Sequence, residues 1–190
     1  MNAVLRQAPN ILSALLLVAA PIAAWFILHE KDFPALCVFA FAALSDAADG
    51  FLAKKFGLAS RFGAWLDPAA DKLLMLASFV TLTYVHAVPL WVTVLVIGRD
   101  VAIVLGFVLG WVLGLALEVA PLMVGKLSTV VQALYILMVL LLRTMHEPPP
   151  DVERAGAWVV ALVTAWSIVA YAQVWLRAAT RRMPQGDGTA

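Results

Sequence analysis

Residues 46–71 read DAADGFLAKKFGLASRFGAWLDPAAD and place four aspartates between two long apolar segments. Apolar residues lead into this stretch from Pro34 and continue after it to Val85. Each pair of aspartates therefore falls at the end of a segment that is long enough to span a bilayer. An aspartate at mid-membrane costs roughly 2.5–3.5 kcal/mol, and less near the interface. Acidic groups at such positions usually face a polar cavity and mark a functional site.

The spacing of the four aspartates predicts that they converge. Asp46 and Asp49 lie three positions apart and share one face of a helix, and Asp67 and Asp71 lie four positions apart on the next helix. The connection between them, residues 54–62, is short and basic, so the two helices are expected to be antiparallel neighbours. Both pairs then lie near the same membrane end and meet at one point.

The residues available at this point favour a hard divalent cation. Four converging carboxylates cannot all stay ionised without cations close by. The three histidines, at positions 29, 86 and 146, map to the opposite membrane end, so the ligand set contains oxygen only. Oxygen ligands favour Mg²⁺ or Mn²⁺ over zinc or copper. Four carboxylates suffice for two ions about 3.5–4 Å apart, the arrangement used for phosphoryl displacement.

The composition places these acids in a membrane protein. Of the 190 residues, 64% are hydrophobic and only 13% are charged, whereas a soluble domain is about half apolar and about a quarter charged. This balance excludes a soluble enzyme and a disordered chain. The net charge of +1 leaves no basic field to hold a nucleic acid. The one cysteine, Cys37, excludes a disulfide framework.

The apolar segments predict an all-α integral membrane protein with six transmembrane helices. A single catalytic domain is expected over residues 1–180, and residues 181–190, with Pro, Gly and Asp, are expected to form a disordered tail. The fourth segment has an apolar continuation as far as Leu117. The six predicted spans are Ile11–Leu28, Pro34–Leu52, Gly63–Val85, Val88–Val108, Lys126–Leu142 and Ala157–Leu176.

The basic residues predict the orientation, because cytoplasmic loops carry an excess of lysine and arginine. With the N-terminus inside, the inner segments carry Arg6, Lys54, Lys55, Arg61, Lys126, Arg177, Arg181 and Arg182. The outer loops carry Lys31, Arg143 and Arg154. Both termini are therefore expected in the cytoplasm, in a multi-pass protein of the inner membrane. The alternative, a cleaved signal peptide over residues 1–24, is disfavoured because the apolar run continues past the small residues Ala23 and Ala24.

The aspartate stretch resembles the signature of a known enzyme family, the CDP-alcohol phosphotransferases. That signature is D-x2-D-G-x2-A-R-x8-G-x3-D-x3-D, and seven of its eight fixed positions agree with residues 46–71 at the correct spacing. The exception is Lys54, where the family has arginine. Lysine keeps the charge but lacks the bidentate fork that arginine offers to a phosphate.

The resemblance implies a role for each signature residue. Asp46, Asp49, Asp67 and Asp71 would bind two Mg²⁺ or Mn²⁺ ions, and Asp71 would also act as the general base. Gly50, Ala53 and Gly63 would line the cytidine pocket, and Lys54 would contact the diphosphate. Taken alone, the three small residues also fit close helix packing. The family fold is six transmembrane helices around a polar cavity open to the cytoplasm, usually in a homodimer.

The reaction that the resemblance implies is phosphatidyl transfer from CDP-diacylglycerol to a hydroxyl group, with release of CMP. Residues 33–142 resemble the cardiolipin synthase branch, whose acceptor is phosphatidylglycerol. The related phosphatidylglycerophosphate synthases, whose acceptor is glycerol-3-phosphate, tend to carry Arg-Glu where this chain has Arg99-Asp100. Both branches often have arginine at the position of Leu16, so contacts of the first helix with acceptor or lipid are in question.

Two basic residues are candidates for binding the phosphate of the acceptor. Arg99 lies within a predicted span, where an arginine is expensive, and its other reading is a pair with Asp100 or an active-site aspartate. Lys126 lies at a span end, where it either binds the acceptor or extends to the interface.

Other classes of protein fit the sequence less well. A membrane transporter would be expected to have broken helices at the midplane and inverted repeats, whereas here the aspartates cluster at one membrane end and no repeat is found. A prenyl-diphosphate enzyme would have its second aspartate pair far downstream, and a purely structural protein would not need four aspartates.

Overall fold

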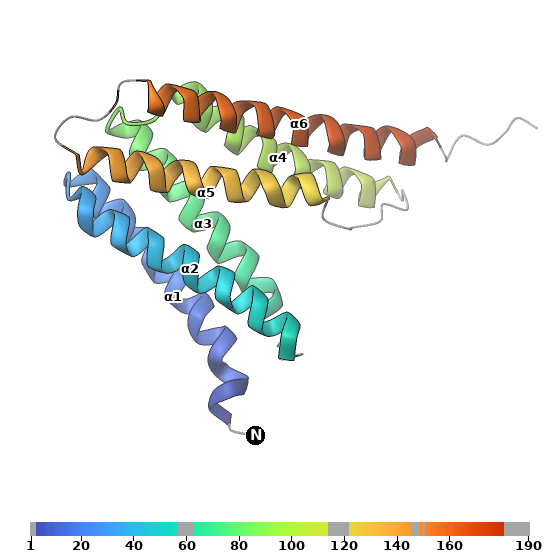
Figure 1. Cartoon of the computed structure of the whole chain (residues 1–190). Helices are drawn as coiled ribbons and strands as arrows, with labels where there is room; N and C mark the ends of the chain where they lie inside the picture. Colours follow the sequence, from blue (N-terminus) through green and yellow to red (C-terminus); the bar gives the residue numbers. More distant parts are fainter. Residues whose placement is uncertain (1–2, 57–62, 114–121, 146–148, 150, 181–190) are drawn as a thin grey trace, which may run out of the picture.

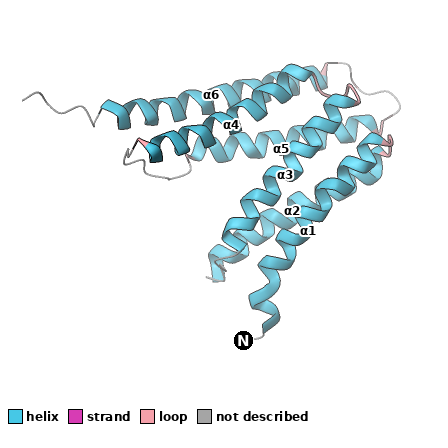
Figure 2. Cartoon of the chain, turned by 180° about the vertical axis from the view of Figure 1, so that it is seen from behind, coloured by secondary structure: helices cyan, strands magenta, loops and turns pink. Residues whose placement is uncertain are grey.

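The computed structural model describes residues 3–56, 63–113, 122–145, 149 and 151–180, and side chains are described for residues 15–45, 70–113, 122–145, 149, 151–177 and 180. Within these residues the chain forms six helices and no strand (Figures 1 and 2). The helices are α1 (Ala3–Leu28), α2 (Asp32–Phe56), α3 (Gly63–Tyr84), α4 (Leu90–Val112), α5 (Met123–Arg143) and α6 (Val152–Thr180).

The helices confirm the six predicted helical segments, and most of them extend beyond the predicted ends, although α3 ends at Tyr84 rather than Val85 and α4 begins at Leu90 rather than Val88. The first begins at Ala3 rather than Ile11, and the last begins at Val152 rather than Ala157. Apolar residues set the length of a span, whereas backbone hydrogen bonding sets the length of a helix and continues beyond the apolar run. Helix α4 follows the predicted continuation as far as Val112. The rest of that continuation, residues 114–117, and the tail at 181–190 lie outside the described residues.

Membrane crossing is supported for part of the chain. Helices α4, α5 and α6 are each long and apolar enough to cross a bilayer. In α1 and α2, the apolar stretches with described side chains are shorter, Leu15–Leu28 and Asp32–Ser45. The outward face of α4 carries large apolar side chains that are about half exposed or more, among them Val94, Val104 and Trp111. Such a face is typical of a helix that contacts lipid.

The helices pack as two groups of three. Helix α1 contacts α2 and α3, and α6 contacts α4 and α5, while α2 with α5 and α3 with α4 and α5 join the groups. The two groups lie close together at the end where α1 turns into α2 and diverge toward the end where the N-terminus lies (Figure 1). Two turns at the closed end, those between α1 and α2 and between α3 and α4, contain Glu30 and His86, whose positive φ angles of 56° and 59° help to reverse the chain.

The first group packs through small side chains on α1. Ala20 and Ala23 are almost completely buried, which lets the neighbouring helices approach closely. Phe39 of α2 and Phe79 of α3 fill the remaining space and are fully buried. Leu16, where related sequences often carry arginine, belongs to this core and is 2% exposed. The first helix therefore presents an apolar side chain to the core at that position.

An ion pair joins the two groups at the closed end. Arg143 Nε donates a hydrogen bond to Asp32 Oδ1 at 2.6 Å, and the two side chains are 23% and 16% exposed. Asp32 lies in the first turn of α2 and Arg143 in the last turn of α5. Each charge also interacts favourably with the dipole of its own helix. The pair therefore fixes α2 against α5 where the groups meet.

Removing either partner of this pair should destabilise the protein. We expect Asp32→Asn and Arg143→Gln each to lower the free energy of unfolding by about 1–2 kcal/mol, since each loses a partly buried, charge-assisted hydrogen bond. The double variant should lose less than the sum of the two. A double-mutant cycle of unfolding in detergent measures this coupling. Strictly additive losses would contradict the proposed contact.

Candidate functional site

The helices place the predicted metal ligands on two neighbouring elements. Asp46 and Asp49 lie in the second half of α2, and Asp67 and Asp71 lie in the first half of α3. The two helices contact each other and are joined by residues 57–62, so the aspartates occupy the adjoining ends of consecutive helices. Asp71 is partly buried, whereas the side chains of the other three lie outside the described part. Their convergence stays a prediction.

The predicted nucleotide pocket lies on the same two helix ends. Gly50, Ala53 and Lys54 belong to α2, and Gly63 is the first residue of α3. Their side-chain surroundings also lie outside the described residues. Among the side chains that the structure does describe, no three from His, Cys, Asp and Glu lie close enough to hold a metal ion. The side chains of three of the four predicted ligands, Asp46, Asp49 and Asp67, are not among those described. The predicted metal site is therefore not tested by this result.

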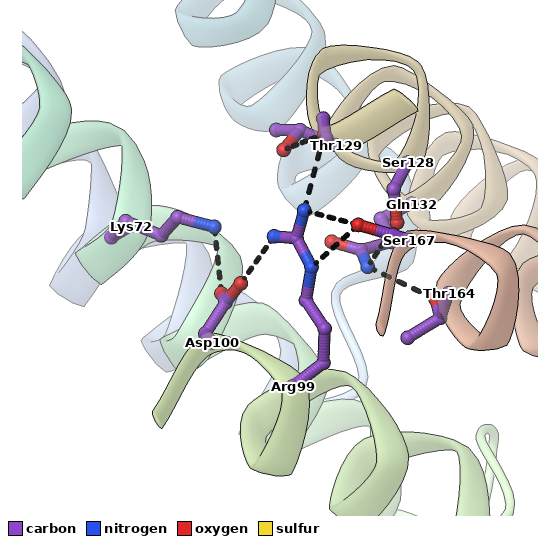
Figure 3. A network of polar contacts seen from close by, with 9 residues as sticks. Lys72, Arg99, Asp100, Ser128, Thr129, Gln132, Thr164 and Ser167 are labelled. Carbon is purple, nitrogen blue, oxygen red and sulfur yellow. Dashed lines mark hydrogen bonds and ion pairs between the residues drawn. The ribbon is translucent and has the colours of Figure 1, made fainter. Parts of the chain in front are cut away.

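Arg99 is held at the centre of a buried polar network (Figure 3). It lies in α4 and is only 5% exposed. Its Nη1 donates to Asp100 Oδ1 at 2.6 Å, and its Nε and Nη2 donate to Ser167 Oγ of α6 at 3.2 and 2.8 Å. A pair with Asp100 is one of the two roles that the sequence leaves open for this arginine, and binding of the acceptor phosphate is the other. It does not exclude the second, because the guanidinium also borders a cavity.

The carboxylate of Asp100 is shared between two cations. Its second oxygen, Oδ2, accepts a hydrogen bond from Lys72 Nζ at 2.6 Å, and the Asp100 side chain is 25% exposed. Lys72 follows Asp71 directly in α3. The chain Lys72–Asp100–Arg99 therefore connects the helix that carries the predicted general base to the helix that carries a predicted acceptor ligand (Figure 3).

Two further residues fix the position of the guanidinium. The Tyr171 ring of α6 lies with its centroid 5.7 Å from Arg99 Cζ, within the range of a cation–π contact. Gly125 of α5 leaves the room that both side chains occupy. A Cβ atom built on Gly125 would lie 2.8 Å from the Tyr171 hydroxyl and 3.1 Å from Arg99 Nη2. A larger residue at this position would therefore force the Tyr171 hydroxyl and the Arg99 guanidinium to shift.

Sequence analysis does not single out Ser167, Tyr171 or Gly125. A signal for two of them exists in α6, where Thr164, Ser167 and Tyr171 recur every three or four residues and share one helix face. Thr164 and Ser167 are fully buried. Thr164 accepts a hydrogen bond from Gln132 Nε2 at 3.3 Å. Read as a polar stripe on an apolar helix, this spacing predicts a partner such as Arg99.

A cavity of about 580 Å³ opens beside this network, between α3, α4, α5 and α6. Both predicted acceptor ligands, Arg99 and Lys126, line it. Most of its wall is apolar, so it differs from the polar cavity that the sequence predicts around the four aspartates. Its lining residues are Lys72, Met75, Leu76, Phe79, Val96, Ile97, Arg99, Asp100, Val101, Ile103, Val104, Leu105, Gly125, Lys126, Thr129 and Tyr171. Several of them, including Leu76, Val101, Val104 and Leu105, are themselves exposed.

Comparison with known proteins identifies the family to which this chain belongs. The chain matches the CDP-alcohol phosphatidyltransferase family over residues 6–172. This match includes the aspartate signature, Arg99 and Lys126. The chain belongs to the CDP-alcohol phosphatidyltransferase family.

Relatives from two branches of this family resemble the chain. The "Cardiolipin synthase (CMP-forming)" of Rattus norvegicus is 40% identical over 97 residues, which are 50% of this chain and 32% of the rat protein. The "Probable phosphatidylglycerophosphate synthase" of Mycobacterium tuberculosis is 34% identical over 171 residues, 86% of this chain and 80% of that protein. The "CDP-diacylglycerol--glycerol-3-phosphate 3-phosphatidyltransferase" of Aquifex aeolicus is 32% identical over 133 residues, 69% of this chain and 74% of that protein.

The extent of these matches differs between the branches. The chain spans about a third of the length of the rat cardiolipin synthase and 46% of the cardiolipin synthase of Streptomyces coelicolor. The cardiolipin synthases therefore match with higher identity over about half of this chain, whereas the phosphatidylglycerophosphate synthases match with lower identity over a larger share of it. The two branches are matched about equally well, and the acceptor is not decided by similarity.

Two glycine substitutions should separate the close approach at Gly125 from a general effect of alanine. We expect Gly125→Ala to lower the free energy of unfolding by about 1–3 kcal/mol, because the Tyr171 ring must shift and Arg99 Nη2 must move out of its hydrogen-bonded position. Gly98→Ala is the matched control, since a Cβ at Gly98 meets nothing within 4 Å. Thermal unfolding in detergent compares the variants. Equal stability of the two would contradict the packing described for Gly125.

Proposed function

We propose that this protein transfers the phosphatidyl group of CDP-diacylglycerol to an acceptor hydroxyl in phospholipid biosynthesis and releases CMP. The observation that carries the proposal is the family match over residues 6–172, which contains the aspartate signature at its correct spacing. The location also fits the chemistry. An enzyme must bind a lipid donor with a nucleotide head group at the boundary of the membrane. The signature lies at two helix ends, where such a boundary is expected.

The four signature aspartates are proposed to hold divalent metal. Members of the family use divalent metals, and the oxygen-only donor set of Asp46, Asp49, Asp67 and Asp71 suits two Mg²⁺ or Mn²⁺ ions. Such ions, when bound, neutralise charge on the diphosphate and on the departing CMP. Gly50, Ala53 and Gly63 are proposed to line the cytidine pocket, with Lys54 near the diphosphate.

Asp71 is proposed as the general base. Its carboxylate takes the proton of the acceptor hydroxyl as the hydroxyl oxygen attacks the phosphorus that bears diacylglycerol. A new phosphorus–oxygen bond forms, and the bond from that phosphorus to the bridging oxygen breaks, so that CMP leaves with its electron pair. For this role the carboxylate must come within about 2.6–3.2 Å of the hydroxyl. Its place on α3, next to Lys72, puts it beside the Lys72–Asp100–Arg99 chain.

Arg99 and Lys126 are proposed to bind the phosphate of the acceptor, since both line the same cavity. We propose phosphatidylglycerol as that acceptor, which makes the protein a cardiolipin synthase, because Arg99 is followed by Asp100 rather than by glutamate. Glycerol-3-phosphate is the second candidate, favoured by the longer match to phosphatidylglycerophosphate synthases.

The protein is further proposed to cross the inner membrane six times as one catalytic domain, residues 1–180, with both termini in the cytoplasm. The alternating direction of the six helices (Figure 1) and the positive charge of the inner segments support this orientation. A homodimer is proposed from the family resemblance.

The acceptor proposal is tested by CMP release from the purified protein in detergent. With CDP-diacylglycerol and Mg²⁺, we expect release when phosphatidylglycerol is supplied and none when only glycerol-3-phosphate is supplied. The reverse result would identify a phosphatidylglycerophosphate synthase. Release that continues unchanged in excess EDTA would contradict the proposed metal site, and no release with either acceptor would contradict the proposed reaction.

The general base is tested by Asp71→Asn. The amide cannot accept the hydroxyl proton, so we expect CMP release to fall by at least about 100-fold, while binding of CDP-diacylglycerol is kept at least in part. Asp151→Asn, the same change at an exposed residue of the α5–α6 connection, should keep full activity. Turnover of Asp71→Asn near the wild-type rate would show that another group takes the proton.

A further inference from the structure

We infer that Ser167 of α6 is a positioning residue for the acceptor phosphate, because it holds the Arg99 guanidinium in place beside the cavity without neutralising its charge. This inference rests on the proposed function, since it takes Arg99 as a ligand of the acceptor phosphate. It adds to that function a residue that lies outside the aspartate signature and acts on the acceptor only through Arg99.

Ser167 occupies one of the two edges by which an arginine binds an oxyanion. Its Oγ atom accepts hydrogen bonds from Arg99 Nε at 3.2 Å and from Arg99 Nη2 at 2.8 Å (Figure 3). These two nitrogens form one side of the planar fork that can bind a phosphate in a bidentate manner. Because Ser167 is fully buried, water does not compete for this edge. The orientation of the guanidinium is therefore set by α6 before an acceptor binds.

The hydrogen bonds of Arg99 leave one of its donors for a ligand. A guanidinium has five N–H donors. Ser167 accepts from two of them, Asp100 Oδ1 accepts one from Nη1, and the Gly125 carbonyl oxygen lies at a longer distance of 3.5 Å from Nη2. In the part of the chain that the structure describes, the second N–H of Nη1 has no acceptor. Since Arg99 lines the cavity, we assign this donor to the acceptor phosphate.

A guanidinium that is fixed in advance binds a phosphate at a lower entropic cost. An arginine side chain has several rotatable bonds and loses much conformational freedom when a ligand holds it. Here Ser167, Asp100 and the Tyr171 ring already hold Arg99, which is 5% exposed. The phosphate therefore meets a cation that is ordered in its absence, and the loss of one holding contact weakens its binding.

The neutral charge of Ser167 preserves the positive charge of the cavity. Three cationic side chains line the cavity, those of Lys72, Arg99 and Lys126. The carboxylate of Asp100 also lines it and is already shared between Lys72 and Arg99. A second carboxylate at position 167 would accept the same hydrogen bonds but would reduce the attraction of the guanidinium for a phosphate. A hydroxyl group supplies the geometry and leaves the charge unchanged.

Thr164 offers a matched comparison about one turn earlier on the same face of α6. It is also fully buried and also accepts a hydrogen bond, but from Gln132 Nε2 at 3.3 Å rather than from Arg99. Neither Ser167 nor Thr164 is among the described residues that line the cavity. If Ser167 only satisfied a buried polar group, the loss of either hydroxyl would affect the enzyme in the same way.

The test compares Ser167→Ala with Thr164→Val in CMP release and in thermal unfolding, both in detergent. We expect Ser167→Ala to raise the KM for phosphatidylglycerol by about tenfold, the equivalent of one hydrogen bond to a charged group. Its kcat and its KM for CDP-diacylglycerol should change by less than about twofold, because Arg99 contacts the acceptor phosphate and not the reacting atoms. Thr164→Val should lower the melting temperature without raising the KM for the acceptor. Glycerol-3-phosphate, which also carries a phosphate, replaces phosphatidylglycerol if the wild-type protein uses it instead.

Ser167→Asp tests the role of the neutral charge and is the second variant if Ser167→Ala fails to fold. It keeps an acceptor for the guanidinium, so we expect a melting temperature no lower than that of Ser167→Ala. The KM for the acceptor should nevertheless rise by about tenfold or more, because the new carboxylate cancels the charge that attracts the phosphate. An acceptor KM equal to that of the wild-type protein would overturn the inference.

Two further results would also overturn it while leaving the proposed function in place. One is an unchanged acceptor KM in Ser167→Ala, and the other is an equal rise in Thr164→Val, which would make both hydroxyls structural. Absence of CMP release from the wild-type protein with either acceptor would instead contradict the proposed function.

Inorganic phosphate decides the inference independently of turnover. At constant ionic strength we expect it to raise the melting temperature of the wild-type protein and of Thr164→Val, since a ligand stabilises the folded state that binds it. The rise should be smaller in Ser167→Ala and absent in Ser167→Asp. Equal rises in all four proteins, or no rise in the wild-type protein, would contradict the role assigned to Ser167.

Discussion

The carboxylate of Asp100, shared between Lys72 and Arg99, is the contact on which the arrangement of the site depends. An arginine that is 5% exposed among apolar helices needs a partner for its charge, and removing one side of such a pair typically costs about 3–5 kcal/mol. Because Lys72 belongs to α3 and Arg99 to α4, the same carboxylate also joins the two groups of helices. Helix α3, which carries the second half of the signature, is thereby held in a fixed position relative to the cavity.

The remaining donors of Arg99 explain why α5 and α6 approach it so closely. Ser167 Oγ accepts hydrogen bonds from two guanidinium nitrogens, and the Tyr171 ring makes a cation–π contact with the same guanidinium. Gly125 supplies the space, because a Cβ atom at this position would lie 2.8 Å from the Tyr171 hydroxyl and force it to shift. Four helices therefore contribute to one buried charge, counting Lys72 from α3. A polar centre of this kind favours one arrangement of helices that otherwise present interchangeable apolar surfaces to one another.

The sequence predicts the helices and the signature but not the network between distant segments. Long apolar runs are sufficient to place six helices, and the spacing of the aspartates is sufficient to identify the family. Apart from the adjacent Asp100, the hydrogen-bond partners of Arg99 lie 26 and 68 residues away along the chain, and only packing brings them together. Leu16 shows the converse. A departure from the family pattern became understandable once its surroundings were known to be the apolar core.

The exposed side chains along the rim of the cavity have a consequence for how it is filled. Val101, Val104 and Leu105 belong both to its lining and to the outer surface of α4, so the cavity opens sideways between helices. A molecule dissolved in the bilayer reaches such an opening by diffusion in two dimensions. Its occupancy then follows the mole fraction of that molecule among the surrounding lipids, and the composition of the membrane replaces the aqueous concentration as the controlling variable.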